Sequence, residues 1–112
     1  MADKRTVLIA GAGIGGLTTA LALSARDFRV VIAERSAELS AFGAGIQLSP
    51  NAAHVLADLG LEDAVAKAAV EPSAIEVRTA GSERPLTSID AGVFRKRYGR
   101  PWRVIHRADL QA

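Results

Sequence analysis

The residues best suited to chemistry in this chain are the glycines of the segment Gly11-Ala12-Gly13-Ile14-Gly15-Gly16. Glycines at positions 11, 13 and 16 satisfy the spacing G-x-G-x-x-G, between a mostly apolar run and a segment of helical periodicity. In such a loop Gly11 permits a tight turn, Gly13 lets the backbone approach a pyrophosphate, and Gly16 lets a helix pack close to a strand. The helix after the loop would direct free N–H groups and its positive dipole end at the phosphates.

An acidic residue stands where a nucleotide site of this kind needs one. Glu34 follows the second apolar run of the chain. Its carboxylate could accept hydrogen bonds from the ribose hydroxyls of an adenosine and would repel a 2′-phosphate. The alternative is a plain glycine turn with a solvated acid nearby, but the order of strand, loop, helix, strand and acid favours the nucleotide site.

Two apolar runs and the segment between them must position the loop and its acid. Residues 7–10 and 29–33 are short and mostly apolar, which is typical of strands buried on both faces of a parallel sheet. Residues 14–25 place Leu17, Ala20 and Leu21 at helical spacing. We therefore expect residues 1–34 to form a βαβ unit with a right-handed crossover.

The next part of the chain predicts a loop and two helices. Residues 36–48 have no sustained period and carry Gly43, so they predict a loop. Ser49 is expected to cap a helix whose first residue is Pro50. A second short helix should follow directly. The residues expected to face inward from the two helices are Ala52, Val55, Leu56, Leu59, Leu61, Ala64, Val65 and Ala68.

The last part of the chain changes to strand-like periodicity. Beyond Pro72, apolar and polar residues alternate on both sides of Gly81-Ser82, which predicts a half-exposed hairpin. Residues 103–106 predict another strand, and residues 108–112 predict a helix that has only begun. The chain as a whole therefore predicts an α/β fold in which a Rossmann-like βαβ unit is followed by helices and a β-hairpin.

Composition and charge narrow the classes of protein that fit these elements. No Cys is present, which excludes disulfides and a cysteine nucleophile, and we expect no metal site. Six of the fourteen Lys and Arg residues lie between Arg95 and Arg107, which predicts a solvated basic loop or an anion-binding surface. An aromatic content of 4% argues against nucleic acid as a partner. The first apolar run is too short for a signal peptide or a membrane span, so we expect no membrane partner and a cytoplasmic location.

The elements after the βαβ unit favour FAD over NAD as the bound dinucleotide. In an NAD domain we would expect a third continuous apolar strand soon after a crossover helix. This chain instead has a long glycine-containing loop, two helices and a half-exposed hairpin.

Four motifs, in this order and spacing, resemble the flavin-dependent aromatic hydroxylases of the salicylate and hydroxybenzoate hydroxylase-like group. The motifs are residues 11–16, Glu34-Arg35, residues 43–52 (GAGIQLSPNA) and residues 106–111 (HRADLQ). The resemblance spans nearly the whole chain. It implies an NAD(P)H-dependent flavoprotein monooxygenase that holds FAD and hydroxylates a small aromatic substrate with O2 through a flavin hydroperoxide. NADH or NADPH would be the reductant, and a homodimer is one assembly that fits.

The resemblance also implies roles for particular residues. Glu34 would hold the adenosine ribose and Arg35 would lie beside the adenine or ribose. The loop Gly45-Ile46-Gln47 would pass close to the isoalloxazine, and Arg107 would contact the ribityl or pyrophosphate part, with Gln111 one helical turn later. The predicted cofactor-binding residues are thus Gly11, Gly13, Ile14, Gly15, Gly16, Glu34, Arg35, Gly45, Ile46, Gln47, Arg107 and Gln111.

Simpler interpretations stand beside these roles. Arg35 and Arg107 are also interpretable as surface cations, and Gln47 as an ordinary loop amide. His54 is expected to be solvated and His106 to be structural, so no catalytic residue is identified.

The resemblance places the substrate domain and a later Gly-Asp motif beyond this sequence. We therefore expect residues 1–112 to be the N-terminal part of an FAD-binding domain, incomplete at the C-terminus and inactive alone. The competing hypotheses are another FAD- or NAD-linked oxidoreductase and a non-catalytic nucleotide-binding module.

Overall fold

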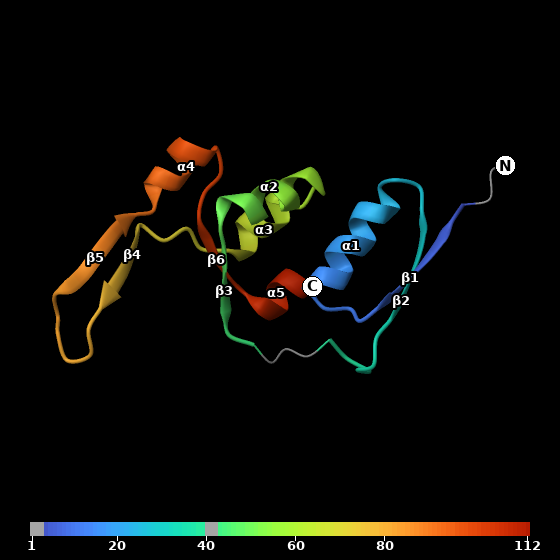
Figure 1. Ribbon diagram of the computed structural model, residues 1–112, viewed down its shortest axis with the longest axis horizontal. Coiled ribbons are helices and arrows are strands. Elements are labelled where there is room, and N and C mark those ends of the chain that lie inside the picture. Colours follow the sequence, from blue (N-terminus) through green and yellow to red (C-terminus); the bar gives the residue numbers. More distant parts are fainter. Residues whose placement is uncertain (1–3, 40–42) are drawn as a thin grey trace. The chain divides into compact units, whose positions relative to one another are not determined.

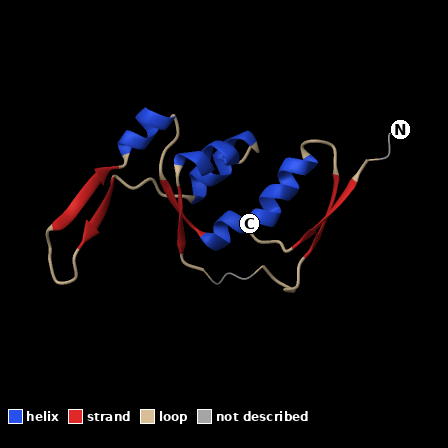
Figure 2. Cartoon of the chain, in the orientation of Figure 1, coloured by secondary structure: helices blue, strands red, loops and turns tan. Residues whose placement is uncertain are grey.

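The computed structural model describes residues 4–39 and 43–112 of the chain. The chain divides into two compact units, which are drawn in Figures 1 and 2. The first unit consists of residues 1–44 and 107–112, and the second consists of residues 45–106. The first unit therefore combines the start of the chain with its last six residues.

A βαβ unit forms most of the first unit, as predicted. Strand β1 (Thr6–Ala10) pairs in parallel with β2 (Arg29–Ala33) through helix α1 (Ile14–Ser24), with Thr6 opposite Arg29 and Ala10 opposite Ala33. The short helix α5 (Arg107–Gln111) belongs to the same unit and packs against α1.

Only one face of the two-stranded sheet is covered in the described chain. Alternate residues of both strands are half-buried, and Ile9 lies on the side of α1. On the other face Leu8 is 70% exposed and Val31 is 44% exposed. The expectation of strands buried on both faces is therefore wrong for these residues. On α1, Ala20 is buried and Leu17 half-buried as predicted, whereas Leu21 is exposed.

The second unit has a ladder that the sequence pattern did not predict. Strand β3 (Gly45–Leu48) pairs antiparallel with β6 (Arg103–His106), with Gly45 opposite His106 and Leu48 opposite Arg103. The prediction of a loop over residues 36–48 is therefore wrong for its last four residues. Those residues become a strand because a partner far along the chain supplies the hydrogen bonds, and Leu48 and Ile105 are buried there.

Helices α2 (Pro50–Asp58) and α3 (Glu62–Ala68) follow β3. Ser49 takes the N-cap position before Pro50 as predicted, but its hydroxyl pairs with the Asn51 side chain and makes no capping bond. The residues buried on α2 are Pro50, Ala53 and Leu56, and Val65 is buried on α3. The inward residues were predicted wrongly at Val55, Ala64 and Ala68, which are exposed. Contacts of α2 with β3, α3 and α4 decide which face is covered.

The predicted hairpin is present, and a helix follows it. Strand β4 (Ala74–Arg78) pairs antiparallel with β5 (Pro85–Asp90), with an irregularity between Val77 and Arg78. Helix α4 (Gly92–Tyr98) comes next and ends at Gly99, whose φ of 73° lies in the left-handed region. The expectation of a basic loop is therefore wrong for Arg95, Lys96 and Arg97, which form the last turn of α4. Phe94 of this helix packs on Trp102, with ring centroids 4.9 Å apart.

One cation of the basic cluster is buried rather than solvated. Arg103, on β6, is 4% exposed. Its Nη2 donates to Glu62 Oε1 at 2.8 Å and its Nε donates to Glu71 Oε1 at 3.1 Å, while Arg95 also binds Glu71. The bond from Arg103 holds the pKa of Glu62 below its usual value, and bonds from Arg95 and then Arg103 do the same for Glu71.

We predict that Arg103→Met destabilises the chain by about 1–3 kcal/mol at pH 7, because it leaves Glu62 and Glu71 without a shared donor. Since Arg103 lowers the folded-state pKa of Glu62, its contribution is present above the unfolded pKa and is lost as pH falls through the folded value. The difference between the variant and the wild type should therefore shrink in acid.

Urea denaturation at about pH 7 and about pH 3 measures this effect. Arg97→Met is the matched control, because Arg97 lies exposed on α4 with its guanidinium over the Tyr98 ring. It should change the free energy of unfolding by no more than about 0.5 kcal/mol. Equal changes in the free energy of unfolding for the two substitutions would show that the ion pairs of Arg103 with Glu62 and Glu71 do not stabilise the chain.

Candidate nucleotide-binding site

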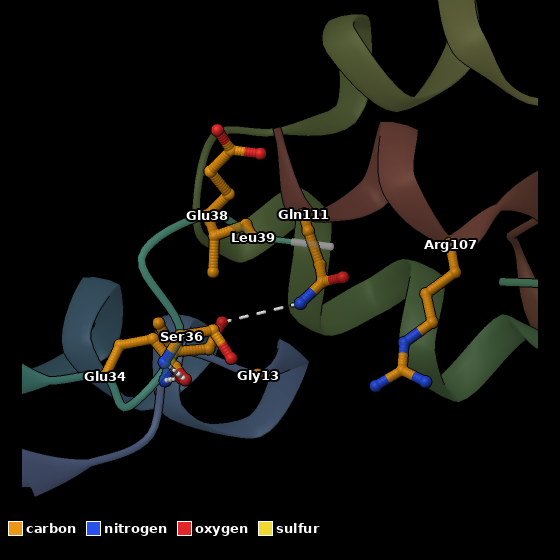
Figure 3. Close-up of a pocket in the computed structure, with 8 residues that line it drawn as sticks. Gly13, Glu34, Ser36, Glu38, Leu39, Arg107 and Gln111 are labelled. Atoms are coloured by element: carbon orange, nitrogen blue, oxygen red, sulfur yellow. Dashed lines mark hydrogen bonds between the residues drawn. The ribbon is translucent and has the colours of Figure 1, made fainter. Parts of the chain in front are cut away.

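A pocket in the first unit gathers residues from the glycine loop, the end of β2 and helix α5 (Figure 3). It is lined by Ala12, Gly13, Glu34, Ser36, Glu38, Leu39, Arg107 and Gln111. In Figure 3 the Glu34 and Ser36 side chains lie at one end of the pocket and the Arg107 side chain lies at the other. The pocket therefore has an acidic end and a basic end.

The glycine loop has the geometry that its spacing predicts. Gly11 has a φ of 99°, in the left-handed region where only glycine is unstrained, and its N–H donates to Ala33 O at 2.7 Å. A Cβ on Gly16 would lie 2.1 Å from Gly11 O, so the start of α1 could not approach the loop with any larger residue. A Cβ on Gly13 would meet nothing within 4 Å, and Gly13 lines the pocket. The loop thus leaves open space where a ligand would approach the backbone.

The Glu34 carboxylate holds the loop against the end of β2. Its Oε2 accepts a hydrogen bond from the Ala12 N–H at 2.7 Å, and its Oε1 accepts one from the Ser36 N–H at 2.8 Å. The bonds from Ser36 and then Ala12 lower the pKa of Glu34. The sequence predicted a ligand contact for Glu34 but gave no sign of this bond to the loop.

Helix α5 brings two predicted residues to the same loop. Gln111 Nε2 donates to Ala12 O at 3.5 Å. Arg107 opens the helix, lines the pocket, and donates its backbone N–H to Ala44 O at 3.4 Å. The structure therefore places Gln111 beside the glycine loop and Arg107 in the same pocket, although almost the whole chain separates both from the loop in sequence.

The other predicted cofactor residues do not line the pocket. Ile14 and Gly15, in the second half of the glycine segment, form the start of α1. Arg35 is exposed next to Glu34 but is not among the pocket-lining residues. Gly45, Ile46 and Gln47 form β3 in the second unit.

Sequence reasoning missed four residues of the pocket lining, namely Ala12, Ser36, Glu38 and Leu39. Ala12 lies inside the glycine loop. The other three follow β2 at the carboxyl edge of the sheet, where α/β proteins bind their ligands, and that position was the available signal. The two histidines do not line the pocket. His54 is exposed as predicted, and its Nε2 lies 2.8 Å from Tyr98 O.

In residues 4–39 and 43–112, no group of three or more His, Asp or Glu side chains could hold a metal ion. Within the same described ranges, no helix is long and apolar enough to cross a membrane.

The sequence matches the FAD binding domain family over residues 4–109. It is 41% identical over 105 residues to 3-hydroxybenzoate 6-hydroxylase 1 of Aquipseudomonas alcaligenes, covering 93% of this chain and 27% of that protein. It is 43% identical over 105 residues to 3-amino-4-hydroxybenzoate 2-monooxygenase of Streptomyces cremeus, again covering 93% and 27%.

Solved structures also superpose on this chain. The tetrameric form of 2-methyl-3-hydroxypyridine-5-carboxylic acid oxygenase superposes with a TM-score of 0.83 at 34% identity, covering 98% of this chain and 28% of that one. Klebsiella pneumoniae HpxO in complex with FAD and uric acid superposes with a TM-score of 0.83 at 28% identity, covering 96% and 27%.

The chain spans about 27% of the length of the relatives that it matches. The predicted resemblance to the flavin-dependent aromatic hydroxylases is confirmed by these relatives, and the predicted α/β fold is confirmed by the superposed structures. Because the family match covers residues 4–109, the chain belongs to the FAD binding domain family.

Proposed function

We propose that this chain binds the adenosine pyrophosphate part of FAD in an NAD(P)H-dependent monooxygenase that hydroxylates a small aromatic compound with O2. The observation that carries the proposal is the convergence of the glycine loop, Glu34 and α5 on one pocket. Residues 1–112 would then be the N-terminal part of the FAD-binding domain of a longer protein. The substrate domain would lie in the rest of that protein.

The residues present suit FAD in shape and in charge. The first N–H groups of α1 have no partner within the helix, and Gly13 has no side chain to keep a pyrophosphate away from them. The Glu34 carboxylate lines the pocket and is an acceptor that suits ribose hydroxyls. The Arg107 guanidinium at the other end of the pocket suits a phosphate or ribityl oxygen. When bound, FAD supplies the redox chemistry, which no side chain of this chain provides.

Several finer parts of the proposal rest on the resemblance to the family and on the lining of the pocket. We propose that Arg35 lies near the adenosine, that Gly45-Ile46-Gln47 lie near the isoalloxazine, and that Ser36, Glu38 and Leu39 border the adenosine. The whole protein is proposed to be cytoplasmic and to assemble as an oligomer, for which a homodimer is the simplest form. A tetrameric form is known for the related pyridine-carboxylic acid oxygenase.

We predict that the chain binds FAD in preference to FMN and NAD, because the loop and Glu34 recognise an adenosine joined to a pyrophosphate. FMN lacks the adenosine, and NAD lacks the flavin half that Arg107 and Gln111 would contact. Isothermal titration calorimetry with the three ligands measures the preference. FMN binding as tight as FAD binding would contradict the proposal.

We predict that Glu34→Gln weakens FAD binding about tenfold, because a neutral amide loses charge-assisted hydrogen bonds and cannot accept from both Ala12 and Ser36 at once. Since the pKa of Glu34 is lowered, wild-type affinity should stay constant across neutral pH and decline only in acid, as pH falls through that lowered pKa. Flavin fluorescence titration between about pH 3 and pH 8 measures both effects. Glu83→Gln, at an exposed position in the second unit, is the matched control and should leave the affinity unchanged.

We predict that these 112 residues alone do not couple NADPH oxidation to hydroxylation of an aromatic acid. The proposed substrate domain is needed to exclude water from the reacting flavin and to orient the ring. NADPH consumption, peroxide and hydroxylated product should be followed with salicylate and 4-hydroxybenzoate as trial substrates. A chain extended through the rest of the protein is the control, and coupled product from the 112 residues would refute the prediction.

A further inference from the structure

Gly43 lies directly against the side chain of Arg107. A Cβ built on Gly43 would be 2.9 Å from Arg107 Cβ, 3.3 Å from Cδ and 3.5 Å from Cγ. Real Cβ atoms essentially never come within 3.0 Å of another heavy atom. Because the Cβ of Arg107 is fixed by the backbone of α5, rotation of the side chain cannot remove this overlap. Any larger residue at position 43 must therefore shift Arg107 or the segment that carries it.

Two hydrogen bonds, one from the Arg107 backbone and one from the Gln111 side chain, hold α5 in the same place. The Arg107 N–H donates to Ala44 O at 3.4 Å, next to Gly43. One helical turn later, Gln111 Nε2 donates to Ala12 O in the glycine loop. The first turn of α5 is thus fixed between residues 43–44 and the loop, and Gly43 provides the surface on which the Arg107 stem rests.

The position of Arg107 sets the charge of the pocket. Among the eight lining residues, Arg107 is the one cation, and Glu34 and Glu38 are anions. If the guanidinium left the pocket, two carboxylates would remain without a positive charge among the lining residues. The formal charge of the lining, one cation and two anions, would then change from −1 to −2, and its repulsion of an anionic pyrophosphate would increase.

We propose that Gly43 is a positioning residue for Arg107. Because Gly43 has no side chain, the aliphatic part of Arg107 can lie against residues 43–44. This contact keeps the guanidinium in the pocket, where it binds an anionic or polar part of FAD. The inference rests on the proposed binding of FAD at this pocket. A positioning role differs from a general packing role, because a substitution of Gly43 should then change FAD affinity only when the Arg107 guanidinium is present.

A double-mutant cycle tests this dependence. FAD affinity is measured for the wild type, Gly43→Ala, Arg107→Ala and the double variant, and thermal unfolding is followed for all four. We expect each single substitution to weaken FAD binding about tenfold and the double variant to bind no more weakly than Arg107→Ala. Gly92→Ala is the matched control, since a Cβ there would meet only the side chain of Asp90. It should leave FAD affinity unchanged.

Additive effects in the cycle would overturn the proposal, because Gly43 would then act on the pocket by another route. Unchanged affinity in Gly43→Ala, or in Arg107→Ala, would also overturn it. A wild-type chain that binds no FAD would contradict both the proposed function and the role of Gly43 in binding the cofactor.

NMR of the chain without cofactor tests the contact between Gly43 and the Arg107 side chain directly. Nuclear Overhauser effects between the Gly43 α protons and the Arg107 side chain should be present in the wild type, and the Arg107 Nε–H signal should shift in Gly43→Ala. Absence of these effects in a folded wild-type chain would overturn the proposal even if FAD binds. Their presence in a chain that binds no FAD would show that the failure lies in the proposed function and not in the packing.

Discussion

The hydrogen bond from the Ala12 N–H to the Glu34 carboxylate joins the two parts of the chain on which the site depends. Ala12 lies inside the glycine loop, and Glu34 follows β2 directly, so one carboxylate fixes the loop relative to the sheet. The parallel pairing of β1 and β2 brings the two positions to the same edge, and the bond between Gly11 N–H and Ala33 O supports it. A loop held in this way has fewer conformations to lose when a ligand binds.

The end of the chain completes this arrangement through a ladder formed elsewhere. In the antiparallel pair of β3 and β6, Gly45 stands opposite His106, so the next residues outward, Ala44 and Arg107, also lie together. Arg107 and Gln111 then reach the pocket and the loop from α5. The site in the first unit therefore depends on the last six residues of the chain as well as on the βαβ unit.

The structure shows which features a single sequence predicts and which it does not. The βαβ unit, the glycine loop and the hairpin were predicted because each is specified by residues close together in the chain. Strand β3 was missed because its partner is distant, and the burial of Arg103 was missed because the acids that pair with it lie on and just after α3. The inward faces of α2 and α3 were partly wrong because short helices bury only what their neighbours cover. At the site, the roles of Gly11 and Gly16 in the turn were predictable, whereas the seat of Arg107 on Gly43 and the bond of Glu34 to the loop required the structure.

The visible absorbance spectrum of the chain, taken after incubation with FAD and removal of free flavin, tests the central claim most directly. The claim is that residues 1–112 hold an adenosine pyrophosphate site organised by the bond between Glu34 and the loop. It predicts that the flavin bands stay with the wild-type protein in stoichiometric amount and are strongly reduced in Glu34→Asp, whose shorter side chain cannot reach both Ala12 and Ser36. A folded wild-type chain that retains no flavin, or equal retention by the Asp variant, would contradict it.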